Sequence, residues 1–171
     1  NFPDKVRNIV TVTTFSPDGA ISREDSGGGS MNLHFPYANI VAGILVFIVG
    51  FIFHWIGQVI SVLNWELATR LGLQERSLPP EYKVYEYSIA VSDSLLAWVY
   101  GAAAFGLLTG APWGLKLAWI PGFALIYHGI SAWVWEGQRR KAGHKLWSNG
   151  MRIAWSSANV LTGTVALMAA G

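Results

Sequence analysis

IVAGILVFIVGFIFHWIGQVISVL, residues 40–63, is the stretch that decides the fold. It carries no Asp, Glu, Lys or Arg, and His54 is its only side chain that titrates near neutral pH. A hydrocarbon core about 30 Å thick needs about 20 apolar residues per helix. Backbone groups in lipid must be hydrogen-bonded within the segment, which a helix achieves. Pro36, just before the stretch, suits the first turn of a helix. We therefore predict a transmembrane helix over residues 40–63.

Three further stretches are long and apolar enough to cross a bilayer: residues 88–109, 115–135 and 150–170. Pro121 lies inside the third of the four spans and predicts a kink, because proline removes a helical hydrogen bond. Residues 110–114 (GAPWG) form a tight turn between the second and third spans. The pattern predicts an all-α membrane protein, a four-helix transmembrane up-down bundle.

Composition agrees with a membrane protein of one domain. The chain has 171 residues, of which 52% are hydrophobic and 13% are charged, against about a quarter charged in soluble domains. We expect the lipid bilayer as partner and no nucleic acid, because a formal charge of +2 is too small for that role. The absence of cysteine excludes disulfides and thiolate metal sites.

Lysine and arginine in short loops predict the orientation in the membrane. The hairpin between the second and third spans has only Lys116, whereas the other connections hold seven basic residues. We therefore expect loops 64–87 and 136–149 to be cytoplasmic and both termini to be outside. Within the first loop, residues 64–73 either extend the first helix or lie flat at the interface. The seven basic residues are Arg70, Arg76, Lys83, Arg139, Arg140, Lys141 and Lys145.

We expect residues 1–30 to form an extended extramembrane tail. Gly27–Ser30 directly precedes Met31, so the tail is either a fused segment that ends in a flexible linker or a natural mature tail. Residues 9–19 combine a β-branched run with a turn and are too short to form a domain. We expect the tail to contact a partner subunit, with residues 31–171 as the transmembrane domain.

Polar side chains on all four predicted helices fall at a similar depth. Ionisable groups inside the hydrocarbon region are costly and indicate a functional site. Counted along the helices, the set lies about 8–14 Å below the cytoplasmic surface, within two helical turns. The predicted polar intramembrane layer, a candidate ligand or proton site, consists of His54, Asp93, His128, Arg152, Ser156 and Asn159.

Three members of this layer are candidate metal ligands. Imidazoles from His54 and His128 could bind haem iron axially, and together with the carboxylate of Asp93 they suit a divalent metal such as zinc or iron. Two histidines and one aspartate have no diagnostic spacing. A single histidine in a membrane helix is also more often a packing residue than a ligand.

Structural roles are the alternative for the charged residues. Asp93 could pair with Arg152 and lock the bundle together. Glu86 and Glu136 fall at the interface, where a carboxylate is normally solvated.

Three functions are compatible with this pattern. An accessory or interaction subunit of a larger membrane complex is favoured, because four short helices leave little room for catalytic machinery. A histidine-based site that binds haem or a metal ion, or that relays protons, is the second. A small intramembrane enzyme or carrier is the third, although the sequence has no nucleophile motif, phosphate loop or HExxH pattern.

Overall fold

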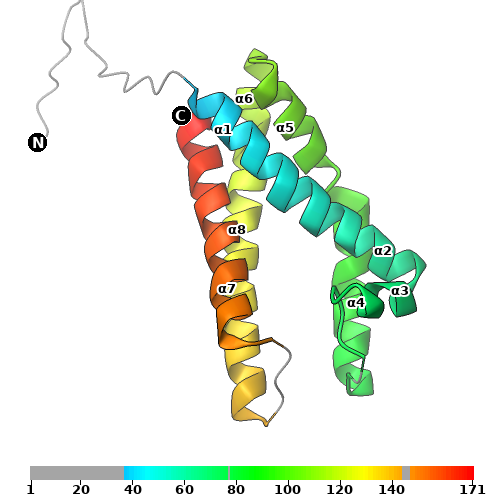
Figure 1. Ribbon diagram of the computed structural model, residues 1–171. Coiled ribbons are helices and arrows are strands. Elements are labelled where there is room, and N and C mark those ends of the chain that lie inside the picture. The colour runs from blue at the N-terminus through cyan, green and yellow to red at the C-terminus, as the bar shows by residue number, and fades with distance from the viewer. Residues whose placement is uncertain (1–36, 77, 144–146) are drawn as a thin grey trace, which may run out of the picture. The chain divides into compact units, whose positions relative to one another are not determined.

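The computed structural model describes residues 37–76, 78–143 and 147–171, and this part of the chain is helical without any strand (Figure 1). Three helices are long and apolar enough to cross a membrane, or four when one bent pair counts as a single span. The all-α class is thereby confirmed, and the apolar helices are compatible with a multi-pass membrane protein, whereas the up-down bundle stays a prediction. The tail, residues 1–30, and its partner contact lie outside the described residues.

The first span is a single continuous helix over residues 38–63. It consists of α1 (Ala38–Leu45), η1 (Val46–Ile56) and α2 (Gly57–Leu63), and the central part is π-helical. A π-helix has hydrogen bonds from residue i to i+5, is rare, and frequently occurs at functional sites. The prediction of a helix over residues 40–63 is confirmed.

Asn64 separates the first span from a short helix that follows it. Its φ of −151° lies outside the helical range, and its side-chain Oδ1 accepts a hydrogen bond of 2.9 Å from the backbone N–H of Leu67. This bond caps α3 (Trp65–Arg70), since asparagine is a favoured N-cap residue. Residues 64–73 therefore do not continue the first helix.

The second span is a bent pair, α4 (Pro80–Leu96) and α5 (Val99–Leu108), with an angle of 43° between them. The prediction of one helix over residues 88–109 was wrong in two respects. The helix begins earlier, at Pro80, and it is interrupted between Leu96 and Val99. Pro80 begins α4 because proline is favoured in a helix's first turn, so much of the predicted loop 64–87 is helical. At the bend, the Tyr100 N–H bonds back only three residues, to the Ala97 carbonyl, at 3.0 Å.

The third span consists of α6 (Pro112–Leu117) and α7 (Trp119–Lys141), interrupted at Ala118. The interruption lies within one turn before Pro121, where the missing proline N–H removes a bond to the preceding turn. α7 also extends past Trp135, so only residues 142–148 of the predicted loop 136–149 lie between helices.

The fourth span is α8 (Asn149–Ala170), which confirms the prediction over residues 150–170. Ser148 caps it, since its Oγ accepts a hydrogen bond from the Met151 N–H at 3.1 Å. Serine is one of the residues that are favoured at the N-cap of a helix.

α7 and α8 run side by side along most of their length (Figure 1). Glycines make this close approach possible. A Cβ added at Gly163 would lie 2.5 Å from the Gly122 carbonyl oxygen, and one added at Gly129 would lie 2.9 Å from the Ser156 carbonyl oxygen. These neighbours are backbone atoms, so they cannot move away as a flexible side chain can.

The first span crosses between the α7–α8 pair and the bent second span (Figure 1). α1 packs on both α5 and α8, and α2 packs on α4. The central η1 contacts α4, α5, α7 and α8. A side chain on the buried face of η1 can therefore meet residues from every other span.

Replacing Gly163 by alanine should destabilise the protein by about 1–3 kcal/mol, because the new methyl group overlaps the backbone of α7. Gly150→Ala on the same helix is the matched control, since its Cβ would meet nothing closer than 3.9 Å. The thermal unfolding midpoint in detergent micelles measures both. Equal midpoints for the two variants would contradict the close packing of α7 on α8.

Candidate metal centre

His54, Asp93 and His128 come together from three helices, η1, α4 and α7. One ligand atom from each lies within 4.8 Å of the other two. His128 Nε2 is 3.9 Å from Asp93 Oδ1, and the two imidazole ring centroids are 4.6 Å apart. The structure therefore brings together the three residues that the sequence predicts as metal ligands. We refer to them as the histidine–aspartate cluster.

The local fold explains why Asp93 reaches this cluster. Because α4 begins at Pro80, Asp93 lies near the end of that helix rather than near its start. The bend at residues 97–98 follows immediately and turns α5 toward η1. Trp55 donates a hydrogen bond of 3.0 Å from Nε1 to the Ser94 carbonyl, which ties η1 to α4 beside the aspartate.

Asn159 on α8 determines the tautomer of His54. Its Nδ2 donates to the Trp155 carbonyl at 2.8 Å, so its Oδ1 is the atom that faces His54 Nε2, also at 2.8 Å. An amide oxygen only accepts hydrogen bonds, so His54 Nε2 carries the hydrogen. The lone pair of a neutral His54 is then on Nδ1, the nitrogen that could bind a metal ion.

Gln58 plays a comparable part for Asp93. Its Nε2 donates to Asp93 Oδ2 at 3.3 Å, while Asp93 Oδ1 faces His128. Hydrogen bonds of this kind orient metal ligands and are typical of metal sites. Gln58 was not among the predicted site residues, although its position four residues after His54 puts both side chains on one helix face.

Aromatic rings close one side of the cluster. The Tyr100 ring lies edge-on to His54 at 6.3 Å, and the Trp155 ring lies 5.1 Å from it. His54 is only 6% exposed, whereas the side chains of Asp93 and His128 are 17% and 21% exposed. The cluster is therefore covered on its His54 side and open on its Asp93–His128 side.

Arg152 does not join the cluster. It donates to the Trp133 carbonyl at 2.6 Å, and its guanidinium carbon lies 3.7 Å from the Trp133 ring centroid. Gly137 leaves room for it, since a Cβ there would lie 2.9 Å from an Arg152 nitrogen. No ion pair joins Asp93 to Arg152 in the described part of the chain, so that alternative was wrong.

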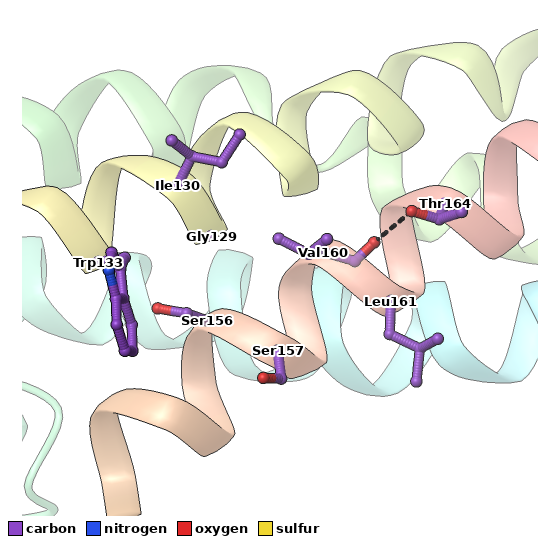
Figure 2. A pocket seen from close by; sticks show the side chains of 8 residues that line it. All are labelled: Gly129, Ile130, Trp133, Ser156, Ser157, Val160, Leu161 and Thr164. Atoms are coloured by element: carbon purple, nitrogen blue, oxygen red, sulfur yellow. Dashed lines mark hydrogen bonds between the residues drawn. The ribbon is translucent and has the colours of Figure 1, made fainter. Parts of the chain in front are cut away.

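Ser156 lies at the same level but belongs to an open groove between α7 and α8. Its Oγ is buried without a hydrogen-bond partner. Figure 2 shows Ser156 between the α7 and α8 ribbons, on the same groove as Gly129 and Trp133. The groove has a volume of about 480 Å³ and is lined by Gly129, Ile130, Trp133, Ser156, Ser157, Val160, Leu161 and Thr164.

Charged residues at the basic end of α7 are buried, contrary to the prediction of a solvated Glu136. Glu136 is 1% exposed and Arg139 is 2% exposed. Glu136 Oε1 accepts a hydrogen bond from Arg140 Nε at 2.9 Å, and Arg139 Nη2 contacts Glu75 Oε2 at 2.6 Å. The spacing of four residues between Glu136 and Arg140 was the available signal for their pairing.

The cluster suits a single metal ion better than haem. Imidazole–metal bonds are about 2 Å long, so two axial ligands of one haem would hold their ring centroids about 6 Å apart. The observed separation of 4.6 Å leaves no space for a porphyrin between His54 and His128. Ligands of one divalent ion stand about 3–4 Å apart, which small side-chain movements could reach here.

Comparison with known proteins gives no match: no family, curated protein or solved structure is significantly similar to this chain.

We expect neutral His54 to carry its hydrogen on Nε2, because Asn159 offers only an acceptor there. Nitrogen-15 chemical shifts of the histidine rings measure this, with the His54 signals assigned by their loss in His54→Gln. Asn159→Ala should shift the population toward the Nδ1–H tautomer, whereas Ser157→Ala, on the exposed face of the same helix, should not. A dominant Nδ1–H form in the unmodified chain would contradict the assigned network.

Proposed function

We propose that this protein is a multi-pass membrane protein that binds one divalent transition-metal ion between His54, Asp93 and His128. The observation that carries the proposal is the convergence of three ligand atoms, from three separate helices, to within 4.8 Å. Zinc and ferrous iron are the ions that two imidazoles and one carboxylate suit best.

The surroundings of the cluster support this function. Asn159 and Gln58 provide the second hydrogen bond that metal-binding histidines and carboxylates usually have. Three protein ligands also leave at least one coordination position for water or a substrate, which is typical of catalytic zinc sites rather than structural ones. An ion bound here would therefore be available for exchange or for chemistry.

The orientation in the membrane is part of the proposal. We propose four crossings, with α4 and α5 as one broken span, and both termini outside. The support is the distribution of basic residues, since α3, the first turn of α4 and the end of α7 hold Arg70, Lys83 and the run Arg139–Lys141. Positive residues of this kind favour the cytoplasmic side.

A role as accessory subunit of a larger membrane complex is compatible with a bound metal ion and stays a prediction. A role as a small intramembrane enzyme or carrier is equally compatible with an open coordination position. A pull-down in mild detergent separates these roles, because an accessory subunit should return a stoichiometric partner and a self-sufficient enzyme or carrier should not.

The purified protein should bind about one equivalent of Co²⁺ or Zn²⁺, and His54→Ala, Asp93→Asn and His128→Ala should each weaken binding by about 100-fold or more. Asn159→Ala should weaken it by about 10–100-fold, as is usual for residues that orient a ligand. Cobalt absorbance during titration, with zinc competition, measures these affinities.

Glu66→Gln is the matched control, because Glu66 is an exposed residue paired with Arg70 on α3. Its affinity for Co²⁺ should equal that of the unmodified chain. Binding that survives all three ligand substitutions would contradict the proposed site.

A further inference from the structure

α4 and α7 meet through long side chains rather than through close backbone packing. The Tyr82 and Tyr85 rings lie 5.4 Å and 5.1 Å from the Trp135 ring, and the Arg139 guanidinium lies 5.4 Å from the Tyr82 ring. We call this contact the α4–α7 seam and define it by Tyr82, Tyr85, Glu86, Trp135 and Arg139.

The seam leads from the basic end of the protein to the histidine–aspartate cluster. Glu86 precedes Asp93 by seven residues, and Trp135 follows His128 by seven, so each pair shares one helix face. Glu86 on α4 lies within electrostatic range of Arg139 on α7. Seven helical residues span about 10 Å, so Glu86 lies about two turns outside the cluster.

Buried polar atoms lie at both ends of this route. Arg139 is 2% exposed, and its Nε and Nη1 have no hydrogen-bond partner. At the inner end, Gln58 Oε1 beside Asp93 is likewise buried and unpartnered. Buried polar groups in proteins are nearly always hydrogen-bonded, and water serves where protein groups do not. We therefore expect water at both ends of the seam.

The exposure of the cluster's side chains indicates the side from which water reaches the cluster. Asp93 and His128 keep a fifth or so of their side chains exposed, whereas His54 and Asn159 on the opposite side are buried. Tyr100 closes the far end next to His54. A carboxylate exposed to lipid would be costly, so the exposed side of Asp93 is expected to face water.

From these observations we propose that the α4–α7 seam is a one-sided hydrated access path, through which a hydrated divalent cation reaches the histidine–aspartate cluster from the basic end. Glu86 is the intermediate carboxylate on this path, and Tyr100 marks its closed end. The identity of the cation rests on the proposed function, whereas the hydration of the seam does not.

The chain has no cysteine, so single-cysteine variants can be made directly. A charged methanethiosulfonate reagent modifies thiolates in water and not thiols in lipid. Glu86→Cys in oriented membrane vesicles should react at least about 10-fold faster than Leu95→Cys, because hydration favours the thiolate. Leu95 is the matched control, since it lies on the same helix, two residues from Asp93, and its apolar side chain is 68% exposed.

Modification of Glu86→Cys only from the side of the basic segments supports the path. A Glu86→Cys thiol that does not react, reacts no faster than Leu95→Cys, or reacts equally from both sides overturns it. Occupation of the seam by a partner helix instead of water would give the first of these results.

Glu86→Gln provides a second measurement that does not depend on a new thiol. Its rate of Co²⁺ loading should fall about 10-fold, with equilibrium affinity changed far less, because Glu86 lies outside the ligand set. Glu81→Gln, in the exposed first turn of α4, is the control and should load at the normal rate. An unchanged rate of Co²⁺ loading in Glu86→Gln would show that Glu86 is not part of the access path.

The outcomes separate this inference from the proposed function. Stoichiometric Co²⁺ binding together with an unreactive Glu86→Cys thiol would support the metal site and contradict the hydrated access path. A reactive thiol in a protein that binds no metal would support a hydrated seam and contradict the metal site.

Discussion

The hydrogen bond between His54 and Asn159 is the interaction on which the site depends. It joins the first span to the last, orients the imidazole and leaves its other nitrogen with the lone pair. In a low-dielectric interior a satisfied polar pair of this kind is favourable, whereas either partner alone would be costly. The cluster with Asp93 and His128 is then a consequence of how η1 is held against its neighbours.

The α7–α8 pair provides the rigid support for that bond. Gly122, Gly129 and Gly163 allow the two backbones to approach closely, so His128 and Asn159 are presented from one packed unit. α4 makes a different contact with α7, through the aromatic rings of both helices and the Arg139 guanidinium over the Tyr82 ring. One side of the cluster is therefore closed by packing, and the other is bordered by polar groups.

Much of this arrangement could be predicted from residue patterns. The spans around residues 40–63 and 150–170 follow from hydrophobicity and length. Counting along helices also predicts that His54 and His128 lie at a similar level, whereas Asp93 was counted from a start near Ser88 and α4 begins at Pro80. The bend at residues 97–98 could not be predicted, because nothing local in AWVY breaks a helix. It arises where α5 turns to pack on the first span.

The sequence by itself determined that the chain is helical, apolar enough for a membrane, and polar at one depth in several spans, because these properties depend on composition and on spacing along each helix. Only the tertiary structure decided which polar groups meet. Arg152 contacts a carbonyl on α7 and Ser156 lines an open groove, while Gln58 contacts Asp93 and Tyr100 packs beside His54. Such choices depend on helix rotation and crossing, which long-range packing sets and local patterns do not.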